Sequence, residues 1–377
     1  MKRILYFTPM DIGKRFGGGL ASRAYYDAVC RLFPGQVDLM LPEEYCVGPF
    51  ADAIAVPPRS RIRALLSGSL HRYRLFMRDY LRRNAHLYSL CVLNDGFRAG
   101  DMMDMIHGFG LRTMVVHHNF EREYHMGSKS IFTFGGHYAG LVVRNERQAY
   151  VKAHVNCFLT AADAQLFEQA YGKRAHNYLL GVFEAADSKL PLLQEVRREP
   201  LVAITGSMNT AQTEFGVMNF RERYFHCLRE LLPDWKVRIA GRNPSEPIRA
   251  FADEYPDVIE LIPNPEDMSE VVNPCGVFLC PTHVGGGLKL RVMDGLRQGL
   301  PVLTHRVSAR GYDAFVGEPF FAVYEDEGSF REGLQKVASL TLTLETRKQI
   351  QKQYAAVFGF EAGLRRMEKI LANFTDE

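Results

Sequence analysis

The sequence predicts an α/β protein built of two Rossmann-like domains, and three observations carry this prediction. Short apolar runs alternate with runs of helical spacing along most of the 377 residues. Strands that alternate with helices in this way form parallel sheets with helices on both faces. The alternation is interrupted at Pro191–Pro200, a polar stretch bounded by prolines that is typical of an interdomain linker. The chain is also too long for one ordinary hydrophobic core, so two domains are expected.

The first half begins with a buried strand, Lys2–Phe7, and a loop that runs to the glycines Gly17–Gly19. A helix is expected directly after this loop, at Leu20–Phe33. Further strands are expected at Gln36–Leu41, Leu87–Leu93, Met114–His117 and Val155–Thr160, and further helices at Gly140–His154 and Ala162–Tyr171. Ligands of such sheets bind beyond the carboxyl ends of the strands, which makes Gly17–Gly19 a candidate ligand loop.

The second half repeats the pattern after the linker. Strands are expected at Leu201–Ser207, Trp235–Arg242, Val258–Pro263, Gly276–Pro281 and Pro301–His305, and helices at Asn219–Leu232, Ile248–Tyr255 and directly after Gly287. The carboxyl ends of three of these strands carry small and basic residues, at Thr205–Ser207, Gly241–Arg242 and Thr282–Gly287. This edge of the sheet is therefore the candidate ligand side. The final stretch, Thr341–Phe374, is expected to be helical.

Composition narrows the class of protein. With 47% hydrophobic and 24% charged residues, the chain has the composition of a soluble globular enzyme. A net charge of +3 is too small to predict nucleic-acid binding. The seven cysteines form no CxxC pair, which predicts reduced core thiols rather than a disulfide framework or a zinc site. No apolar run approaches the roughly 18 residues that span a bilayer, and the first apolar segment is too short for a signal peptide, so a cytoplasmic protein is expected.

Three consecutive glycines, Gly285–Gly287, separate an expected strand from an expected helix. Glycines at this place let the backbone approach a ligand closely, and the free N–H groups of a helix N-terminus attract anions. Lys289 and Arg291 are expected in the first turn, where the helix dipole disfavours a cation by about 0.3–1 kcal/mol. A bound anion would reverse that penalty. The alternative is a surface turn whose Lys and Arg point into water.

At Gly285–Pro301 the chain resembles the family-four retaining glycosyltransferases, the glycosyl transferases group 1, which have the GT-B fold. The matching elements are the glycines, a basic residue at Lys289 or Arg291, an acidic residue at Asp294, and the segment Gly299–Val302. Other segments similar to the family follow in the same order along the chain: Gly17–Gly19, His117–Tyr124, Ile239–Arg242 and Arg306–Tyr312.

The resemblance implies two Rossmann-like domains that face each other across a cleft. Residues 1–190 would be an acceptor-binding domain and residues 200–345 a nucleotide-sugar-binding domain, with a C-terminal helix at 346–377 that crosses back to the first domain. The implied reaction is the retaining transfer of a hexose-type sugar from a nucleoside-diphosphate sugar, with a UDP-sugar favoured. The implied acceptor is a glycan, a lipid-linked intermediate or a protein.

The residues expected to carry the reaction follow from the same matches. His117, Arg242 and Lys289 are the candidate catalytic residues. The candidate nucleotide-sugar contacts are Gly18, Gly19, Ser207, Arg242, His283, Gly286, Gly287, Leu288, Lys289 and Asp294, and the candidate acceptor or sugar contacts are His118, Asn119 and Glu121. No Asp-x-Asp pair follows a strand, so neither a metal nor another cofactor is expected. For Asp294 the alternative is a salt bridge to Arg291 or Arg297, three residues away on either side.

The chain departs from the family at the first of two acidic positions. The second acid, which holds the nucleotide ribose in the family, is matched by Asp294, whereas the first falls on Gly286. A carboxylate that contacts the donor sugar is therefore absent. This departure keeps two alternatives open, namely an inactive glycan- or membrane-surface-binding protein on the same fold, and a nucleotide-sugar epimerase.

The segment Arg59–His86 is strongly basic, with arginines interleaved among Leu, Tyr, Phe and Met. One interpretation is an interfacial helix that holds the enzyme peripherally on the inner face of an anionic membrane. The alternatives are a solvated arginine face on an ordinary helix and a basic wall for the acceptor.

Overall fold

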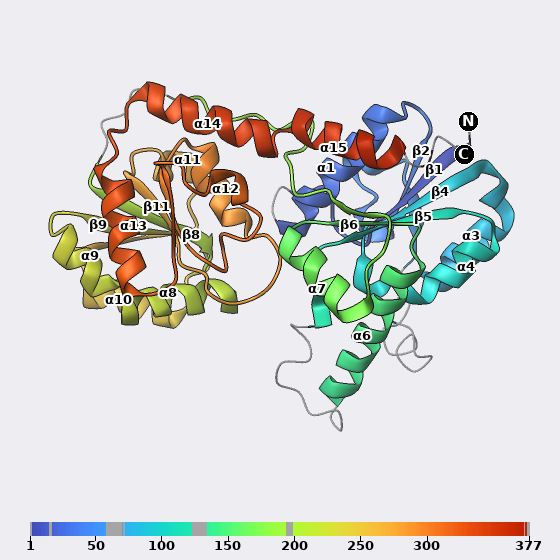
Figure 1. Ribbon diagram of the computed structural model, residues 1–377, viewed down its shortest axis with the longest axis horizontal. Coiled ribbons are helices and arrows are strands. Elements are labelled where there is room, and N and C mark those ends of the chain that lie inside the picture. Colours follow the sequence, from blue (N-terminus) through green and yellow to red (C-terminus); the bar gives the residue numbers. More distant parts are fainter. Residues whose placement is uncertain are drawn as a thin grey trace. The chain divides into compact units, whose positions relative to one another are not determined.

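The computed structural model describes residues 2–14, 17–57, 70, 72–122, 134–193, 199–372 and 374. The chain divides into two compact units, one formed by Met1–Ser188 with Phe360–Glu377 and the other by Lys189–Gly359. Each unit has one parallel sheet with helices packed around it (Figure 1). The predicted α/β class, with two Rossmann-like units, is confirmed.

The first unit contains a seven-stranded sheet in the order β3-β2-β1-β4-β5-β6-β7, with every strand parallel to its neighbours. Its strands are β1 Arg3–Phe7, β2 Val37–Pro42, β3 Ile54–Val56, β4 Tyr88–Leu93, β5 Arg112–His117, β6 Val155–Phe158 and β7 Asn177–Leu179. The sequence did not predict β3 and β7. Both are edge strands of three residues with mixed burial, so their apolar pattern is too short to stand out.

Helices cover this first sheet on both faces (Figure 1). They are α1 Gly17–Leu32, α3 Arg74–Asn84, α4 Met103–Gly108, α6 Phe134–Lys152, α7 Ala161–Tyr171 and α15 Phe360–Ala372. The helix α7 begins where the Thr160 hydroxyl accepts a hydrogen bond from the Asp163 N–H, and it ends at Gly172, whose φ of 88° favours glycine.

The last helix, α15, belongs to the first unit and packs on α1. The Arg366 guanidinium donates hydrogen bonds to the carbonyls of Leu180 and Val182, at 2.7 and 3.3 Å. Gly363 lies against the Phe183 ring, where any larger residue would collide with it. Because α14, Leu344–Phe358, belongs to the second unit, the segment 346–377 forms parts of two helices rather than one.

The second unit contains a six-stranded parallel sheet in the order β10-β9-β8-β11-β12-β13. Its strands are β8 Leu201–Ser207, β9 Lys236–Arg242, β10 Ile259–Pro263, β11 Val277–Cys280, β12 Val302–His305 and β13 Phe321–Tyr324. Its helices are α8 Ala211–Arg223, α9 Phe225–Leu231, α10 Glu246–Glu254, α11 Met268–Val272, α12 Leu290–Arg297, α13 Glu327–Ser339 and α14. The stretch predicted as one helix at 219–232 is therefore two, separated at Tyr224.

The two units have separate hydrophobic cores on the central strands of their own sheets. Cys91, Cys157, Cys227, Cys275 and Cys280 are buried, and all seven cysteines are free thiols, as the sequence predicts. Among the helices within the described ranges, none combines the length and the apolar content needed to cross a bilayer.

Candidate active site

The carboxyl ends of the parallel strands β8, β9, β11 and β12 lie at one edge of the second sheet. The last residues of β8 and β9, Ser207 and Arg242, are direct neighbours in the strand register. The Arg242 side chain is exposed there, whereas Ser207 is half-buried. The loop that contains Gly285–Gly287 follows β11 at the same edge. The sheet therefore gathers three of the predicted donor-site segments.

Glycines let these segments approach one another closely. A Cβ at Gly241 would collide with the carbonyl oxygen of Gly206 on the adjacent strand. A Cβ at Gly216 in α8 would lie 3.0 Å from the Cα of Thr282, which opens the glycine loop. The β8 and β9 ends, the first turns of α8 and the loop are thus packed backbone against backbone.

The glycine loop has two positions that need glycine and one that does not. Gly285 and Gly287 have φ values of 89° and 69°, in the left-handed region that side chains disfavour. Gly286 has an ordinary φ, and a Cβ added there would meet no heavy atom within 4 Å. The loop conformation is therefore set by Gly285 and Gly287, while the position of the missing carboxylate opens onto free space.

Lys289 lies one residue before the helix in which it was predicted. The helix α12 begins at Leu290, and Lys289 is its N-cap with an extended backbone. Its ammonium group bends back over the loop and donates hydrogen bonds to the Gly286 carbonyl at 2.8 Å and to the Gln212 side chain at 3.2 Å. The Tyr312 hydroxyl donates to the Lys289 carbonyl at 2.7 Å. The cation is thereby fixed over the glycines.

Asp294 forms the ion pair that the sequence leaves open as an alternative. The Arg291 guanidinium lies 3.3 Å from the Asp294 carboxylate, and both side chains are 40% exposed. Exposed pairs of this kind are worth about 0–1 kcal/mol, so the pair can open for a ligand at little cost. The Arg291 Nε is 3.7 Å from the place of a Cβ on Gly206, which puts this second cation at the end of β8.

His283 adds a neutral hydrogen-bonding group beside the glycines. Burial lowers the pKa of its imidazole, with the positive charge of Arg223 as a smaller cause. Its Nδ1 is buried and has no hydrogen-bond partner among the described residues. A buried polar atom of this kind costs stability unless a ligand or water satisfies it.

At the carboxyl edge of the first sheet, His118 follows β5 and Asn94 follows β4. The His118 Nε2 donates to the Asn94 side-chain oxygen at 2.6 Å, and the Asn94 amide reaches the Thr8 hydroxyl at 3.5 Å. Burial lowers the pKa of His118 to about 4, so the ring is neutral at pH 7. Because Nε2 carries the proton, Nδ1 is left as a hydrogen-bond acceptor.

The structure contradicts the prediction that His117 presents its ring to a substrate. Its side chain is 1% exposed, stacks on Phe158 and donates a hydrogen bond from Nε2 to the Asn156 side-chain oxygen at 2.9 Å. Burial lowers its pKa to about 4. In a parallel strand neighbouring side chains point to opposite faces, so the chain directs His117 into the core and His118 away from it.

The next residues, Asn119 and Glu121, are half-buried and hydrogen-bonded to each other at 3.2 Å. A buried acid that the sequence analysis missed, Glu146 of α6, accepts hydrogen bonds from the Glu121 N–H at 2.6 Å and from the Tyr171 hydroxyl at 2.7 Å. Burial raises the pKa of Glu146 to about 7. The signal was available, because Glu146 is four residues after Val142 on the apolar face of an expected helix.

Gly18 and Gly19 belong to the first turn of α1 rather than to a loop, because this helix begins at Gly17. A Cβ at Gly19 would collide with the Asp11 carbonyl, and one at Gly18 would lie 3.6 Å from the Met10 sulfur. Gly19 therefore lets the helix start pack against the preceding loop. The predicted contact of Gly18 and Gly19 with the nucleotide sugar stays a prediction.

The basic segment Arg59–His86 falls partly on residues 59–69 and 71, which lie outside the described residues. The described remainder includes α3, which buries Met77 and Leu81. Its arginines at 74, 78, 82 and 83 are exposed. This part is an amphipathic helix with an exposed arginine face, and the three interpretations of the segment stay predictions.

One group in the described chain has the chemistry of metal ligands. Ligand atoms of His226, Cys227 and Glu327 lie within 4.8 Å of one another. The Glu327 carboxylate is already paired with the Arg331 guanidinium at 3.0 Å, and Arg331 also contacts Glu230 at 2.8 Å. A cation at this group would have to displace the arginine.

Comparisons with known proteins agree with this geometry. Residues 199–339, most of the second unit, match the family described as Glycosyl transferases group 1. The sequence matches none of the curated proteins.

Solved structures share the fold at low sequence identity. HepE of Anabaena in complex with UDP is 9% identical with a TM-score of 0.66, covering 98% of this chain and 100% of HepE. The lipopolysaccharide outer core galactosyltransferase WaaB is 10% identical with a TM-score of 0.69, covering 99% of this chain and 100% of WaaB. TarM is 12% identical with a TM-score of 0.59, and its match covers 79% of this chain but only 58% of TarM.

These likenesses concern the fold, and together with the two parallel sheets they confirm the predicted GT-B architecture. The match of residues 199–339 covers the strand ends and the glycine loop described above. Residues 199–339 therefore form a glycosyl transferases group 1 domain within a chain of the GT-B fold.

Proposed function

We propose that the enzyme transfers a hexose-type sugar from a nucleoside-diphosphate sugar, with retention of configuration, to a glycan, a lipid-linked intermediate or a protein. The single observation behind this proposal is the Lys289 ammonium group, held over the Gly285–Gly287 loop at the carboxyl edge of the second sheet. A UDP-sugar is favoured because HepE and the pneumococcal transferase GtfA were both solved in complexes that contain UDP.

In the proposed reaction, the leaving diphosphate lies over the glycine loop. Lys289, Arg242 and the N–H groups of Gly286, Gly287 and Leu288 would receive the charge that develops as the glycosidic bond breaks. Donors held in place before the reaction usually make the largest contribution to catalysis. Because these groups balance the diphosphate charge, the proposal includes no metal ion.

Asp294 would hold the ribose of the nucleotide, with Ser207 and His283 contacting the donor nearby. The Arg291–Asp294 pair opens in this step, and Arg291 becomes available to the phosphates. The pair is half exposed, so its loss is small compared with the hydrogen bonds that a ribose would form.

The first unit would contact the sugar or the acceptor through His118, Asn119 and Glu121. Hydroxyl groups of a sugar are neutral and both donate and accept hydrogen bonds, which suits the neutral His118 imidazole and its Nδ1 acceptor. In a retaining transfer on the leaving-group face, the departing phosphate accepts the proton of the acceptor hydroxyl. The reaction then needs no separate general base.

Incubation of the purified protein with a panel of nucleotide sugars tests the proposal. We expect release of UDP or GDP with at least one donor and acceptor, and weaker nucleotide binding by the Lys289→Ala and Asp294→Ala variants. Lys352→Ala, which removes an exposed lysine from α14, is the matched control. If no nucleotide is released and none stabilises the protein in a thermal shift assay, the proposal is wrong.

The absent carboxylate at Gly286 favours one further candidate, a protein of this fold that binds glycans or membrane surfaces without transferring a sugar. Nucleotide binding without nucleotide release would indicate this candidate. Conversion of the donor sugar without any acceptor would instead indicate a nucleotide-sugar epimerase.

A further inference from the structure

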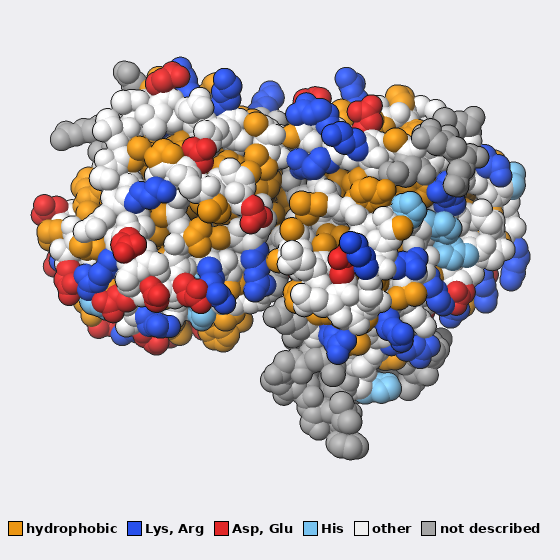
Figure 2. Space-filling view, viewed as in Figure 1, with side chains coloured by type: hydrophobic (Ala, Val, Ile, Leu, Met, Phe, Trp, Pro, Cys, Tyr) orange, Lys and Arg blue, Asp and Glu red, His pale blue; other side chains and the backbone are white. Residues whose placement is uncertain are grey.

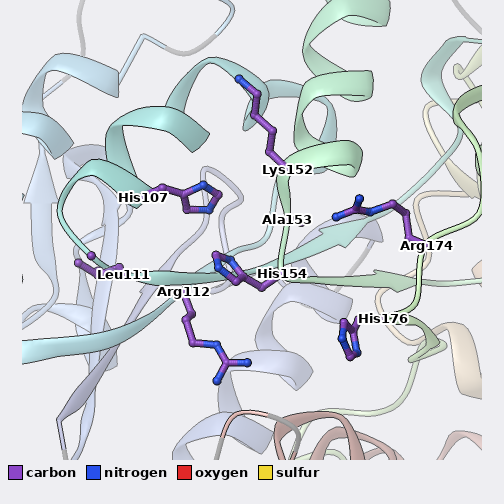
Figure 3. Close-up of a pocket in the computed structure, with 9 residues that line it drawn as sticks. His107, Leu111, Arg112, Lys152, Ala153, His154, Arg174 and His176 are labelled. Atoms are coloured by element: carbon purple, nitrogen blue, oxygen red, sulfur yellow. The ribbon is translucent and has the colours of Figure 1, made fainter. Parts of the chain in front are cut away.

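A polar pocket lies at the amino-terminal edge of the first sheet (Figure 3). Its volume is about 580 Å³. It is lined by His107, Gly110, Leu111, Arg112, Lys152, Ala153, His154, Arg174 and His176. These residues come from the end of α4, the start of β5, the end of α6 and the segment before β7. Because the sheet is parallel, this edge is opposite the carboxyl edge that carries His118, and none of the predicted site residues lies here.

The pocket lining is cationic. Arg112, Lys152 and Arg174 contribute three permanent positive charges, and none of the lining residues is acidic. Lys152 forms an ion pair at 2.6 Å with Asp104, which lies outside the lining and is 79% exposed. Histidine and basic side chains also gather over the part of the first unit where β5 lies (Figure 2). The formal charge of the lining residues is therefore positive.

Two neutral histidines lie around Thr113. The His154 Nδ1 accepts from the Thr113 N–H at 3.1 Å, so its proton is on Nε2. The His107 Nε2 lies 3.0 Å from the Thr113 hydroxyl, and the two rings meet edge to face at 4.8 Å.

Burial lowers the pKa of both histidines, and nearby charges act on each. For His107 the next causes are Asp104, which raises the pKa, and Lys152, which lowers it. For His154 they are His107 and Arg112, which both lower it. Figure 3 shows the two imidazoles side by side, with the Arg174 guanidinium extended toward them from the β7 side.

We propose that this pocket is a second ligand site that binds a phosphate group, carried either by a soluble compound or by a lipid headgroup. A phosphate has a charge of about −1.5 to −2 and three acceptor oxygens, which match several cations and N–H donors at close range. Guanidinium groups bind its oxygens in pairs. The site is independent of the proposed sugar transfer, because its residues lie at the other edge of the sheet.

The test measures binding of inorganic phosphate by calorimetry at low ionic strength. All proteins carry Lys289→Ala, so that binding at the glycine loop is weakened equally. The variant Lys152→Gln/Arg174→Gln removes two charges from the pocket, and we expect its affinity to fall about a hundredfold, about tenfold for each lost charge-assisted hydrogen bond. The matched control is Lys173→Gln, which removes an exposed charge one residue away from the lining.

A second arm compares vesicles of phosphatidylcholine with vesicles that also contain phosphatidylglycerol. If the double variant loses affinity only for inorganic phosphate, a soluble ligand is supported. If it loses affinity only for the phosphatidylglycerol vesicles, a lipid headgroup is supported. Loss in both arms supports a site for either source. If the double variant binds both probes as the Lys173→Gln control does, while all proteins unfold at the same temperature, the proposal is overturned.

Discussion

The carboxyl edges of the two sheets have the same topology but differ in the charge of the side chains that they present. At the first sheet, burial shifts the pKa values of two groups, lowering that of His118 to about 4 and raising that of Glu146 to about 7. At the second sheet the Arg242 side chain is exposed, and Lys289 and Arg291 are only partly buried. One edge presents neutral hydrogen-bonding groups and the other presents cations.

The difference shows how one architecture gives two kinds of surface at the ends of its strands. Burial disfavours charge, so the groups packed under β4 and β5 are suited to neutral hydroxyls. Glycine-rich strand ends keep the second edge open, so its cations remain charged and are suited to a diphosphate. Each of the following variants changes one side of this comparison.

The largest effect is expected for Lys289→Ala. It removes the cation over the glycine loop, and we expect kcat/KM to fall by about 10²–10³, as for other preorganised donors. The Gly286 carbonyl and Gln212 are polar groups at the partly open strand ends, where water can replace the ammonium group, so thermal stability should change little. Steady-state kinetics measures kcat/KM for Lys289→Ala and for the control variant Lys352→Ala. Equal kcat/KM in the two variants would show that the Lys289 cation does not contribute to the reaction.

The second effect concerns the neutral edge and its pH dependence. Glu146 has a pKa raised from 4.5 to about 7 in the fold, so its stabilising contribution is full below pH 4.5 and is lost as the pH rises toward 7. We expect Glu146→Gln to remove up to about 3 kcal/mol of this dependence. Urea unfolding of both proteins between these pH values measures it. Parallel curves for wild type and variant would show that Glu146 is not held neutral.

The third effect separates two adjacent histidines. His117→Ala leaves a cavity beside Phe158 and should cost about 3 kcal/mol of stability, with a smaller change in kcat/KM. His118→Ala should reduce kcat/KM about tenfold through one lost hydrogen bond to the sugar or acceptor, with a smaller loss of stability. Urea unfolding measures the loss of stability in both variants, and steady-state kinetics measures the change in kcat/KM. If kcat/KM falls more in His117→Ala than in His118→Ala, His117 rather than His118 contributes to the reaction.

The smallest effects are expected in the glycine loop. Gly285→Ala forces a side chain into a left-handed conformation and should cost about 1–2 kcal/mol of stability. The Cβ of a Gly286→Glu variant would meet no heavy atom within 4 Å, so stability should stay within about 0.5 kcal/mol. If the loop contacts the donor sugar, the Gly286→Glu enzyme should change its relative rates with different sugars. Unchanged rates on every donor would place the sugar elsewhere.

The sequence by itself determined the fold class and the central strands of both sheets, whereas the short edge strands β3, β7 and β13 were not predicted. Strands buried on both faces leave continuous apolar runs, and the glycine, proline and polar residues that follow them mark the strand ends. The helix starts were less certain, because Gly17 and Lys289 lie at boundaries where local preferences are weak. The pattern located the strand ends, and their parallel arrangement then placed Ser207, Arg242 and the glycine loop at one edge.

Only the tertiary structure decided which side chains are buried and which groups lie together. Alternation along β5 puts one of two adjacent histidines in the core, and a sequence of two histidines does not say which. The Lys289 contacts with Gln212, and the basic pocket of Arg112, Lys152 and Arg174, join residues far apart in the chain. Such contacts depend on how elements pack, and no local pattern of residues encodes that.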